Sequence, residues 1–426
     1  MQITLHQPLQ PGTYTLTPEA TKPEPTYRKI GRRYYAFETN LIGGNPEYSV
    51  KKARTTKKLL DDKNTGFTPM EVFKYFDTYY HMVGDRVKLS TKLYTSTDGL
   101  NMTEVSEVAF IHKGERVKVD FQNIWVDPDN GWGYVLCEYE NDIWFCAQPS
   151  IIGGGRFDTF ELWHKVPIEG AKDTKHSIYH DKINGEWWIH GRSRGVQDWI
   201  GETDPFKANR RAVKILYSKN PFENNWEMVN DIDPLDYQLD YATTRHRIDY
   251  YSSDILQLEP GLYITQIGCY FQDEQRTIPH RPERKAGTGQ TFPVLAYSHN
   301  GLNWFIPFPE RSLIDLKQHH RTWNGVPNEV GQIHAGTVIR IGEDYHLYYG
   351  ARPDTHYFVQ DGQSNASHFV GIIPNGEFVS VKGDWFMLES PTNYDRVKYY
   401  TNKGIKHDTN ITNTDEVYWW EFEELM

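Results

Sequence analysis

The sequence of 426 residues has only three cysteines, Cys137, Cys146 and Cys269. None of them stands at the paired spacing typical of a metal site. Cys137 and Cys146 lie in apolar, strand-like runs, so we expect buried free thiols. An odd and low cysteine count fits a reducing compartment.

Long apolar runs and a strong positive charge are also missing. No stretch approaches the roughly 18 apolar residues of a membrane span, and residues 1–11 lack a basic segment followed by an apolar run, so no signal peptide is predicted. The net charge is -11, which argues against non-specific binding of nucleic acid. We expect neither a membrane nor a nucleic acid as partner, and a cytoplasmic or virion-associated protein.

Familiar catalytic and cofactor motifs are absent too. The sequence has no His-Glu-x-x-His pair and no Gly-x-Ser-x-Gly elbow. The glycines before Arg156 are not followed by a helical pattern, so they make a poor phosphate loop. No cofactor and no metal are predicted from these motifs.

Aromatic residues, in contrast, are abundant at 14%, with 28 Tyr and 13 Trp, which favours strands and sugar-stacking surfaces. Leu295–Trp304 reads Leu-Ala-Tyr-Ser-His-Asn-Gly-Leu-Asn-Trp, and Leu93–Met102 is a near copy with Asp-Gly in place of Asn-Gly. Both dipeptides tolerate positive φ and are strong hairpin signals. A hairpin recurring at two distant points predicts a repeated all-β unit.

Five further segments repeat the order strand, turn, aromatic strand. They are Met70–Met82, Phe121–Tyr139, His176–His190, Tyr251–Ile267 and His334–Gly350. Third strands follow some of them, at Arg211–Ser218 and Phe292–Ser298. Five four-stranded units predict a five-bladed β-propeller, with long loops because the units exceed the usual roughly 40–50 residues.

The predicted domain organisation is an N-terminal extension, residues 1–66, packed on a propeller of residues 67–426. Within the extension, Tyr27–Thr39 is expected to form a hairpin about Gly31, and Lys51–Asp62 is the best helix candidate. Its lysine-rich sequence is interpreted as a solvated face, with anion binding as an alternative. The strand-like Val417–Phe422 is expected to close the propeller by pairing terminal strands.

Two groups of segments resemble a known family. Pro69–Tyr80 followed by Ser96–Asn101 looks like the first blade of the five-bladed β-propeller glycosidases, which include arabinanases, β-xylosidases, invertases and mannoside phosphorylases. Thr291–Trp304 and Gly331–Gly350 resemble later blades of invertase-like proteins of unassigned activity. The resemblance covers about residues 67–350, implies the fold more strongly than the substrate, and implies a carbohydrate substrate.

In the resembled enzymes, two carboxyl groups at the starts of innermost strands cleave the glycosidic bond. The acids at such positions here are Glu71, Asp120, Asp173, Asp249 and Glu329. The family's first-blade Asp-Pro pair is replaced by Pro69 and Met70, with Glu71 next to them. We expect Asp173 to act with one of Glu71, Asp249 or Glu329. For Glu71, Asp120 and Glu329 the alternative is an acid that caps local amides.

Cationic and aromatic residues are the candidate substrate ligands. They are Arg192, Arg194, Arg245, His176, His246, His334 and Trp323. Arginine forks suit carboxylates, phosphates or vicinal hydroxyls, so an anionic sugar is one candidate substrate. As alternatives, the arginines form structural salt bridges, Trp323 is an ordinary packed side chain, and the three histidines meet at the axis around a metal.

A glycoside hydrolase-like enzyme is therefore the favoured function. Two alternatives stay open: a glycoside phosphorylase, with several cations beside a single acid, and a non-catalytic carbohydrate-binding or host-recognition propeller, with no two carboxylates within about 10 Å of each other.

Overall fold

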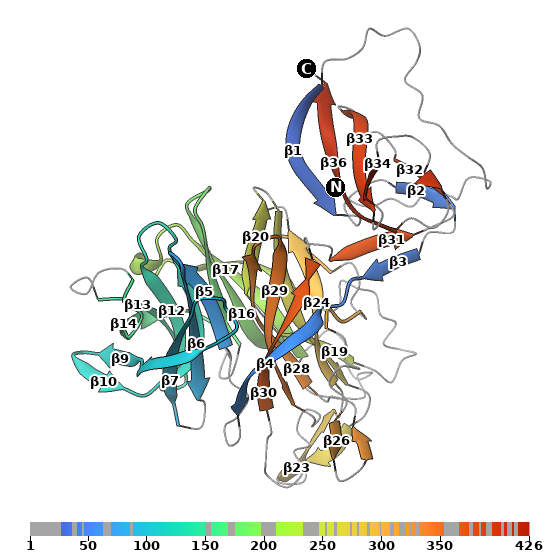
Figure 1. Ribbon diagram of the computed structural model, residues 1–426. Coiled ribbons are helices and arrows are strands. Elements are labelled where there is room, and N and C mark those ends of the chain that lie inside the picture. Colours follow the sequence, from blue (N-terminus) through green and yellow to red (C-terminus); the bar gives the residue numbers. More distant parts are fainter. Residues whose placement is uncertain are drawn as a thin grey trace. The chain divides into compact units, whose positions relative to one another are not determined.

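The computed structural model describes strands throughout the chain (Figure 1). The described residues are 27–35, 41–44, 47–62, 70–85, 88–149, 155–168, 175–196, 210–232, 247–251, 254–259, 262–272, 275–278, 281–287, 290–298, 300–306, 311–314, 321–323, 326–328, 332–352, 366–374, 378–382, 385–388, 394–401, 404–406, 411–412 and 416–425. The predicted all-β fold class is confirmed.

The chain forms two compact units, Ala53–Ile372 and the two terminal segments Met1–Lys52 with Ile373–Met426. The terminal unit contains two sheets, ordered β3-β31-β36-β33-β34 with β1 on β36, and β2-β32-β35. Its strands are β1 Tyr27–Tyr35, β2 Leu41–Gly44, β3 Glu47–Val50, β31 Val379–Lys382, β32 Trp385–Leu388, β33 Tyr394–Thr401, β34 Gly404–Lys406, β35 Ile411–Thr412 and β36 Glu416–Leu425.

The larger unit consists mainly of antiparallel sheets of four consecutive strands, and the first three follow each other in the chain. The first contains β5 Met70–Tyr75, β6 Thr78–Asp85, β7 Ser90–Ser96 and β8 Thr103–Glu107. The second contains β11 Asp120–Val126, β12 Gly133–Tyr139, β13 Asp142–Ala147 and β14 Thr159–Lys165, extended by β9 Ala109–His112 and β10 Glu115–Val117. The third contains β15 Ser177–Asp181, β16 Glu186–Val196, β17 Arg210–Ser218 and β18 Glu227–Ile232, with the 3-10 turn η3 Pro221–Glu223 before β18.

Two more sheets complete this unit, and a single parallel pair, Thr291 with Gln332, joins them. The fourth has a first strand in two pieces, β19 Arg247–Tyr251 and β20 Ile255–Glu259, then β21 Leu262–Gln272, β24 Gln290–Ser298 and β25 Trp304–Phe305. The fifth contains β28 Gln332–Ile341, β29 Asp344–Arg352, β30 Ala366–Ile373 and β4 Arg54–Asp62. Two short hairpins lie in the connections: β22 Gln275–Ile278 with β23 Arg281–Gly287, and β26 Arg321–Trp323 with β27 Val326–Asn328.

The first strands of these five sheets contact one another in a closed ring. β5 contacts β11, β11 contacts β15, β15 contacts β20, β20 contacts β28, and β28 returns to β5. Sheets arranged radially around a ring of first strands make a β-propeller. All five hairpins predicted from the sequence are first and second strands of these sheets.

Strand β4, from the N-terminal side of the chain, completes the fifth sheet as its outermost strand. Its residues pair antiparallel with β30, for example Lys57 with Val370 and Lys58 with Phe369, and Figure 1 shows blue β4 among the orange strands of the fifth sheet. The helix predicted over residues 51–62 is therefore wrong. An edge that needs backbone partners outweighs local helix propensity here.

Other predictions about the chain ends also need correction. Tyr27–Tyr35 is one bulged strand paired with β36, not a hairpin about Gly31. The predicted strand at Val417–Phe422 exists within β36 and does pair with a terminal strand, but in the terminal unit. The compact units also differ from the predicted boundary at residue 66, because β4 belongs to a propeller sheet. That an N-terminal extension packs on the propeller stays a prediction.

The apolar core lies between neighbouring sheets. Phe121 and Met82 belong to a cluster shared by the first and second sheets, and Phe145 and Trp187 to one shared by the second and third. Trp188 joins the third sheet to the fourth. Alternation along each strand sends every second side chain into such an interface. Cys137, Cys146 and Cys269 are buried thiols that form no disulfide, as predicted.

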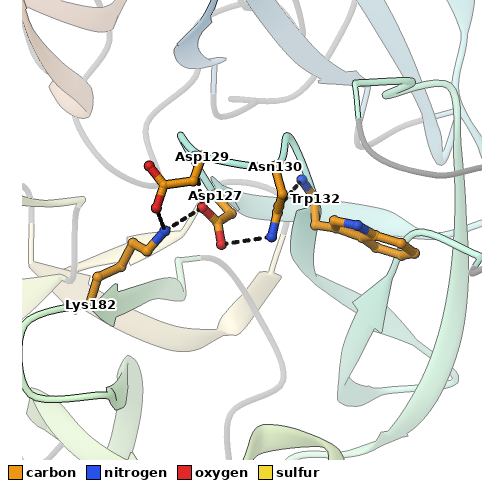
Figure 2. A network of polar contacts seen from close by, with 5 residues as sticks. All are labelled: Asp127, Asp129, Asn130, Trp132 and Lys182. Carbon is orange, nitrogen blue, oxygen red and sulfur yellow. Dashed lines mark hydrogen bonds and ion pairs between the residues drawn. The ribbon is translucent and has the colours of Figure 1, made fainter.

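A polar contact joins the second and third sheets at the turns that follow their first strands (Figure 2). The Lys182 ammonium lies 2.6 Å from Asp127 Oδ1 and also contacts the Asp129 carboxylate. The Asn130 amide donates to Asp127 Oδ2, at 3.1 Å. Burial raises the pKa of Asp127, but hydrogen bonds from Lys182 and the Asp129 amide outweigh it and leave that pKa lowered. Lys182 therefore ties two blades together by charge.

Candidate functional site

Glu71 is the predicted acid that the structure places most clearly in the ring of first strands. It is the second residue of β5, and its side chain is 2% exposed. Thr337 on β28 donates its hydroxyl to Glu71 Oε2 at 2.7 Å, and the same hydroxyl accepts the Val72 amide at 2.9 Å. The contact fixes the Glu71 carboxyl between the first and fifth sheets.

Asp254 and Lys175 complete the surroundings of Glu71. The Glu71 carboxyl hydrogen-bonds Asp254, and Lys175 interacts electrostatically with both acids. Burial raises the pKa of Glu71 well above its usual value, and Asp254 raises it further, while Lys175 and Thr337 oppose the shift. Burial also lowers the pKa of Lys175, which the two acids partly counteract. The raised pKa means that the Glu71 carboxyl keeps its proton to higher pH than an exposed glutamic acid does.

Asn123 on β11 orients Asp254. Its side-chain amide donates to Asp254 Oδ1, and its own oxygen accepts the Ile178 amide of β15 at 2.8 Å. Both ends of the Asn123 amide are therefore assigned by hydrogen bonds. We call Glu71, Asp254, Lys175, Asn123 and Thr337 the axial cluster.

Strand irregularities coincide with this cluster. The register of β11 shifts between Phe121 and Asn123, and that of β28 shifts between Ala335 and Val338, around Thr337. The first strand of the fourth sheet is interrupted between β19 and β20, where Asp254 stands. Bulges re-aim side chains and are frequent beside active sites.

A second group of polar and aromatic residues adjoins the axial cluster. His176 Nδ1 accepts the Arg192 amide at 3.2 Å, and the Arg192 guanidinium lies 5.3 Å from the centre of the Tyr251 ring. That ring meets His334 edge-on at 5.8 Å, and His334 Nε2 lies 3.3 Å from Gln332 Oε1. We call this group the cation–aromatic cluster. His334 precedes Thr337 by three residues, about 10 Å along a strand, and His176 follows Lys175 directly.

The structure therefore brings the predicted ligands His176, Arg192 and His334 into one series of contacts that runs through Tyr251. Asp249 is a fully buried residue of β19. Arg194 lies in β16 and Trp323 in β26, but their side chains are outside the described residues. Four predicted residues are wholly outside the described residues: Asp173, Glu329, Arg245 and His246.

Four residues of the axial cluster were not predicted from the sequence: Asp254, Lys175, Asn123 and Thr337. Asp254 lies at a break inside a strand, whereas the predicted acids stand at strand starts. Thr337 and Asn123 depend on bulges, which leave no clear signal in the sequence. Of the four, Lys175 could have been predicted, because it lies only two residues after the candidate acid Asp173.

The residues that the structure describes contain no cluster of three or more His, Cys, Asp or Glu side chains able to hold a metal ion. The same residues contain no helix that is long and apolar enough to cross a membrane.

Comparisons with known proteins find similarity at the level of structure. No protein-family model matches the chain, and no curated protein sequence matches it. Solved structures that match include a thermostable family-43 glycoside hydrolase, with 11% identity over 85% of this chain and 97% of that chain and a TM-score of 0.45.

Two further matches are also glycoside hydrolases. An endo-arabinase from Bacteroides thetaiotaomicron shows 12% identity over 76% of this chain and 97% of that chain, with a TM-score of 0.42. The catalytic domain of a GH62 α-L-arabinofuranosidase from Coprinopsis cinerea shows 8% identity over 76% of this chain and 97% of that chain, with a TM-score of 0.43. The resemblance of residues 291–304 and 331–350 to invertase-like proteins stays a prediction.

Proposed function

We propose that this protein is a glycoside hydrolase-like enzyme that cleaves a carbohydrate bound at the axis of the propeller. The observation that carries the proposal is the Glu71 carboxyl, which is buried among the first strands beside Asp254 and Lys175, where burial raises its pKa well above the usual value. A carboxylic acid with a raised pKa is what protonation of a glycosidic oxygen requires at neutral pH. The bulges around the axial cluster support the same site.

A second carboxylate must act on the anomeric carbon. Retaining enzymes place their two carboxyl groups about 5–5.5 Å apart, and inverting enzymes about 6.5–9.5 Å apart. Glu71 and Asp254 are in hydrogen-bond contact, so together they supply one acid and cannot flank the bond. We assign the second role to Asp173, which precedes Lys175 by two residues, a span of about 7 Å at most. Asp249 and Glu329 are the alternatives.

The cation–aromatic cluster is the proposed sugar-binding wall. Arg192 and the histidines would bind hydroxyl groups or an anionic group of the sugar, and Tyr251 would bind a ring face. Arg194, Arg245, His246 and Trp323 are proposed to extend this wall. The anionic character of the substrate belongs to the same proposal.

A glycan panel tests the function. Wild type is expected to cleave at least one glycoside, and Asp173→Asn and Glu71→Gln are each expected to reduce that cleavage by about 100-fold or more. Asp142→Asn, at the exposed Asp142–Lys165 ion pair, is the matched control and should keep full activity. Cleavage that survives Asp173→Asn removes Asp173 from the mechanism. No cleavage by wild type, with sugar still bound, identifies a non-catalytic carbohydrate-binding protein.

A glycoside phosphorylase is the second candidate. It is supported by the fact that Glu71 and Asp254 amount to a single acid with the cation Lys175 beside it. A phosphorylase would use phosphate as the attacking group in place of a second carboxylate. Formation of a sugar phosphate only when inorganic phosphate is added would favour it, and Asp173→Asn would then retain activity.

A further inference from the structure

Glu71 and Asp254 differ in their access to a substrate. Glu71 is 2% exposed, and its carboxyl contacts Thr337 and Asp254. Asp254 is partly exposed, at the break between β19 and β20. An acid must lie within about 3 Å of the oxygen that it protonates. A fully buried Glu71 is badly placed for that contact, whereas Asp254 is not.

We propose that Asp254 is the group that hands the proton to the leaving oxygen of the substrate, and that Glu71 stores this proton and passes it to Asp254. The inference rests on the proposed glycoside cleavage and assigns its acid. Asn123 donates an N–H to Asp254 Oδ1. The carbonyl-type oxygen of a protonated carboxyl is the better acceptor, so this hydrogen bond favours the proton on Oδ2.

The proton balance of the step is simple. The shared proton moves from Glu71 to Asp254 Oδ2 and from there to the glycosidic oxygen. The bond between that oxygen and the anomeric carbon breaks, and its electron pair goes to the oxygen, which leaves as an alcohol. Water adds its hydroxyl to the sugar, and the proton released from water restores the pair.

Lys175 has a clear role in this scheme as a positioning residue. Once the proton has left, Glu71 and Asp254 are both carboxylates, and two adjacent negative charges repel each other, most strongly where one of them is buried. The Lys175 ammonium, 8% exposed and interacting with both acids, offsets part of that charge. Thr337 contributes one hydrogen bond to Glu71 Oε2.

Leaving-group dependence tests the assignment. The substrate would be the sugar cleaved by wild type, linked either to dinitrophenol, which leaves without protonation, or to a simple alcohol, which does not. For Asp254→Asn we expect cleavage of the alkyl glycoside to fall by about 10²–10⁴-fold, and cleavage of the dinitrophenyl glycoside to fall by less than about tenfold. Glu71→Gln should show the same pattern, and Asp142→Asn should change neither rate.

The outcomes separate the inference from the function. If Asp254→Asn cleaves the alkyl glycoside within a few-fold of wild type while Glu71→Gln does not, Glu71 is the direct donor and the relay is wrong. If wild type cleaves no glycoside, the proposed function fails and the relay with it.

Infrared difference spectra of the full chain give a readout besides activity: one protonated-carboxyl band at neutral pH that Glu71→Gln removes. Absence of this band overturns the shared proton.

Lys175 is tested by the pH profile of kcat/KM. Without Lys175 the pair should keep its proton to higher pH, so Lys175→Met should move the basic limb to higher pH and lower kcat. Lys175→Arg keeps the charge and should restore the limb. A purely structural lysine would lower the unfolding temperature in Lys175→Met and leave the limb in place, which would contradict the positioning role.

Discussion

At the scale of single residues, burial decides which titratable groups are unusual. Glu71 carries a raised pKa because its carboxyl lies away from water and beside a second acid. His81 and His190 carry lowered pKa values for the same reason of burial. Their local sequences give no sign of this, since Glu71 looks like any acid near a strand start.

The raised pKa of Glu71 predicts a pH-dependent stability. The folded state favours the protonated form of Glu71. The resulting contribution to the free energy of unfolding is complete below the usual pKa near 4.5 and is lost as the pH rises through the pKa of the folded state. Glu71→Gln stays neutral throughout. We expect the unfolding temperature of Glu71→Gln relative to wild type to increase steadily from pH 4.5 to pH 8, measured by calorimetry. A constant difference would show that Glu71 ionises normally.

His81 and His190 predict the opposite pH dependence: the free energy of unfolding should fall as the pH is lowered. Both are fully buried, and neither ring nitrogen of either residue has a hydrogen-bond partner among the described residues. Burial lowers the pKa of His81 to about 4, with Asp98 partly opposing it, and that of His190 to about 3. Their stabilisation is complete above the usual pKa of 6.5 and is lost as the pH falls toward these values.

The test is replacement of one histidine by a ring that never ionises. His81→Phe keeps an aromatic ring beside Tyr348, whose ring lies 5.7 Å from that of His81. Between pH 6.5 and pH 4, wild type should lose up to about 3 kcal/mol more unfolding free energy than His81→Phe, since each pKa unit corresponds to about 1.4 kcal/mol. Chemical denaturation at both pH values measures this, and parallel curves would contradict it.

At the scale of elements, the Asp-Gly and Asn-Gly turns show how much of a repeat the sequence specifies. Gly99 and Gly301 both have φ of +73°, as these dipeptides predict. Asn300 Oδ1 accepts the amides of Leu302 and Asn303, and Asp98 does the same for Leu100 and Asn101. What each turn packs against came only from the structure: Gly99 lies against Tyr348 of the fifth sheet, and Gly301 against Trp188 of the third.

Gly301→Ala is therefore expected to be strongly destabilising. A Cβ there would lie 2.1 Å from the Trp188 indole, inside its van der Waals surface, and the left-handed φ adds strain. Gly342→Ala is the matched control, because Gly342 has φ of +65° but nothing within 4 Å of the added atom. We expect a loss of about 3 kcal/mol or more for Gly301→Ala and about 1 kcal/mol for Gly342→Ala by urea unfolding. Equal losses would mean that only backbone strain matters.

At the scale of the whole molecule, the fifth sheet is closed by β4, a strand that sequence patterning assigned to a helix. Its lysines and threonines give no apolar alternation that would identify a strand. The backbone of β30 nevertheless needs a partner at the edge of the fifth sheet. The predicted boundary at residue 66 assigns β4 to the N-terminal extension, whereas β4 pairs with β30 of the fifth sheet.

Proline scanning of β4 tests this closure. Adjacent residues of an edge strand point their N–H groups alternately toward the neighbouring strand and away from it. We therefore expect one of Lys57→Pro and Lys58→Pro to cost about 3 kcal/mol or more, and the other to be mild. Thermal unfolding with limited proteolysis would measure both. If neither variant is destabilised, β4 does not close the propeller.

The sequence by itself determined the repeated unit: five aromatic hairpins, their glycine turns and their third strands follow from alternation and turn chemistry, which act between near neighbours in the chain. It also indicated Glu71, His176 and His334 as residues at or near the starts of first strands, and Arg192 as a residue that follows Trp187 and Trp188 in the same repeat. Only the tertiary structure decided that Asp254, Lys175, Asn123 and Thr337 meet Glu71, and that β4 pairs with β30. These contacts join residues far apart in the chain, through bulges and an open sheet edge, and no local pattern encodes them.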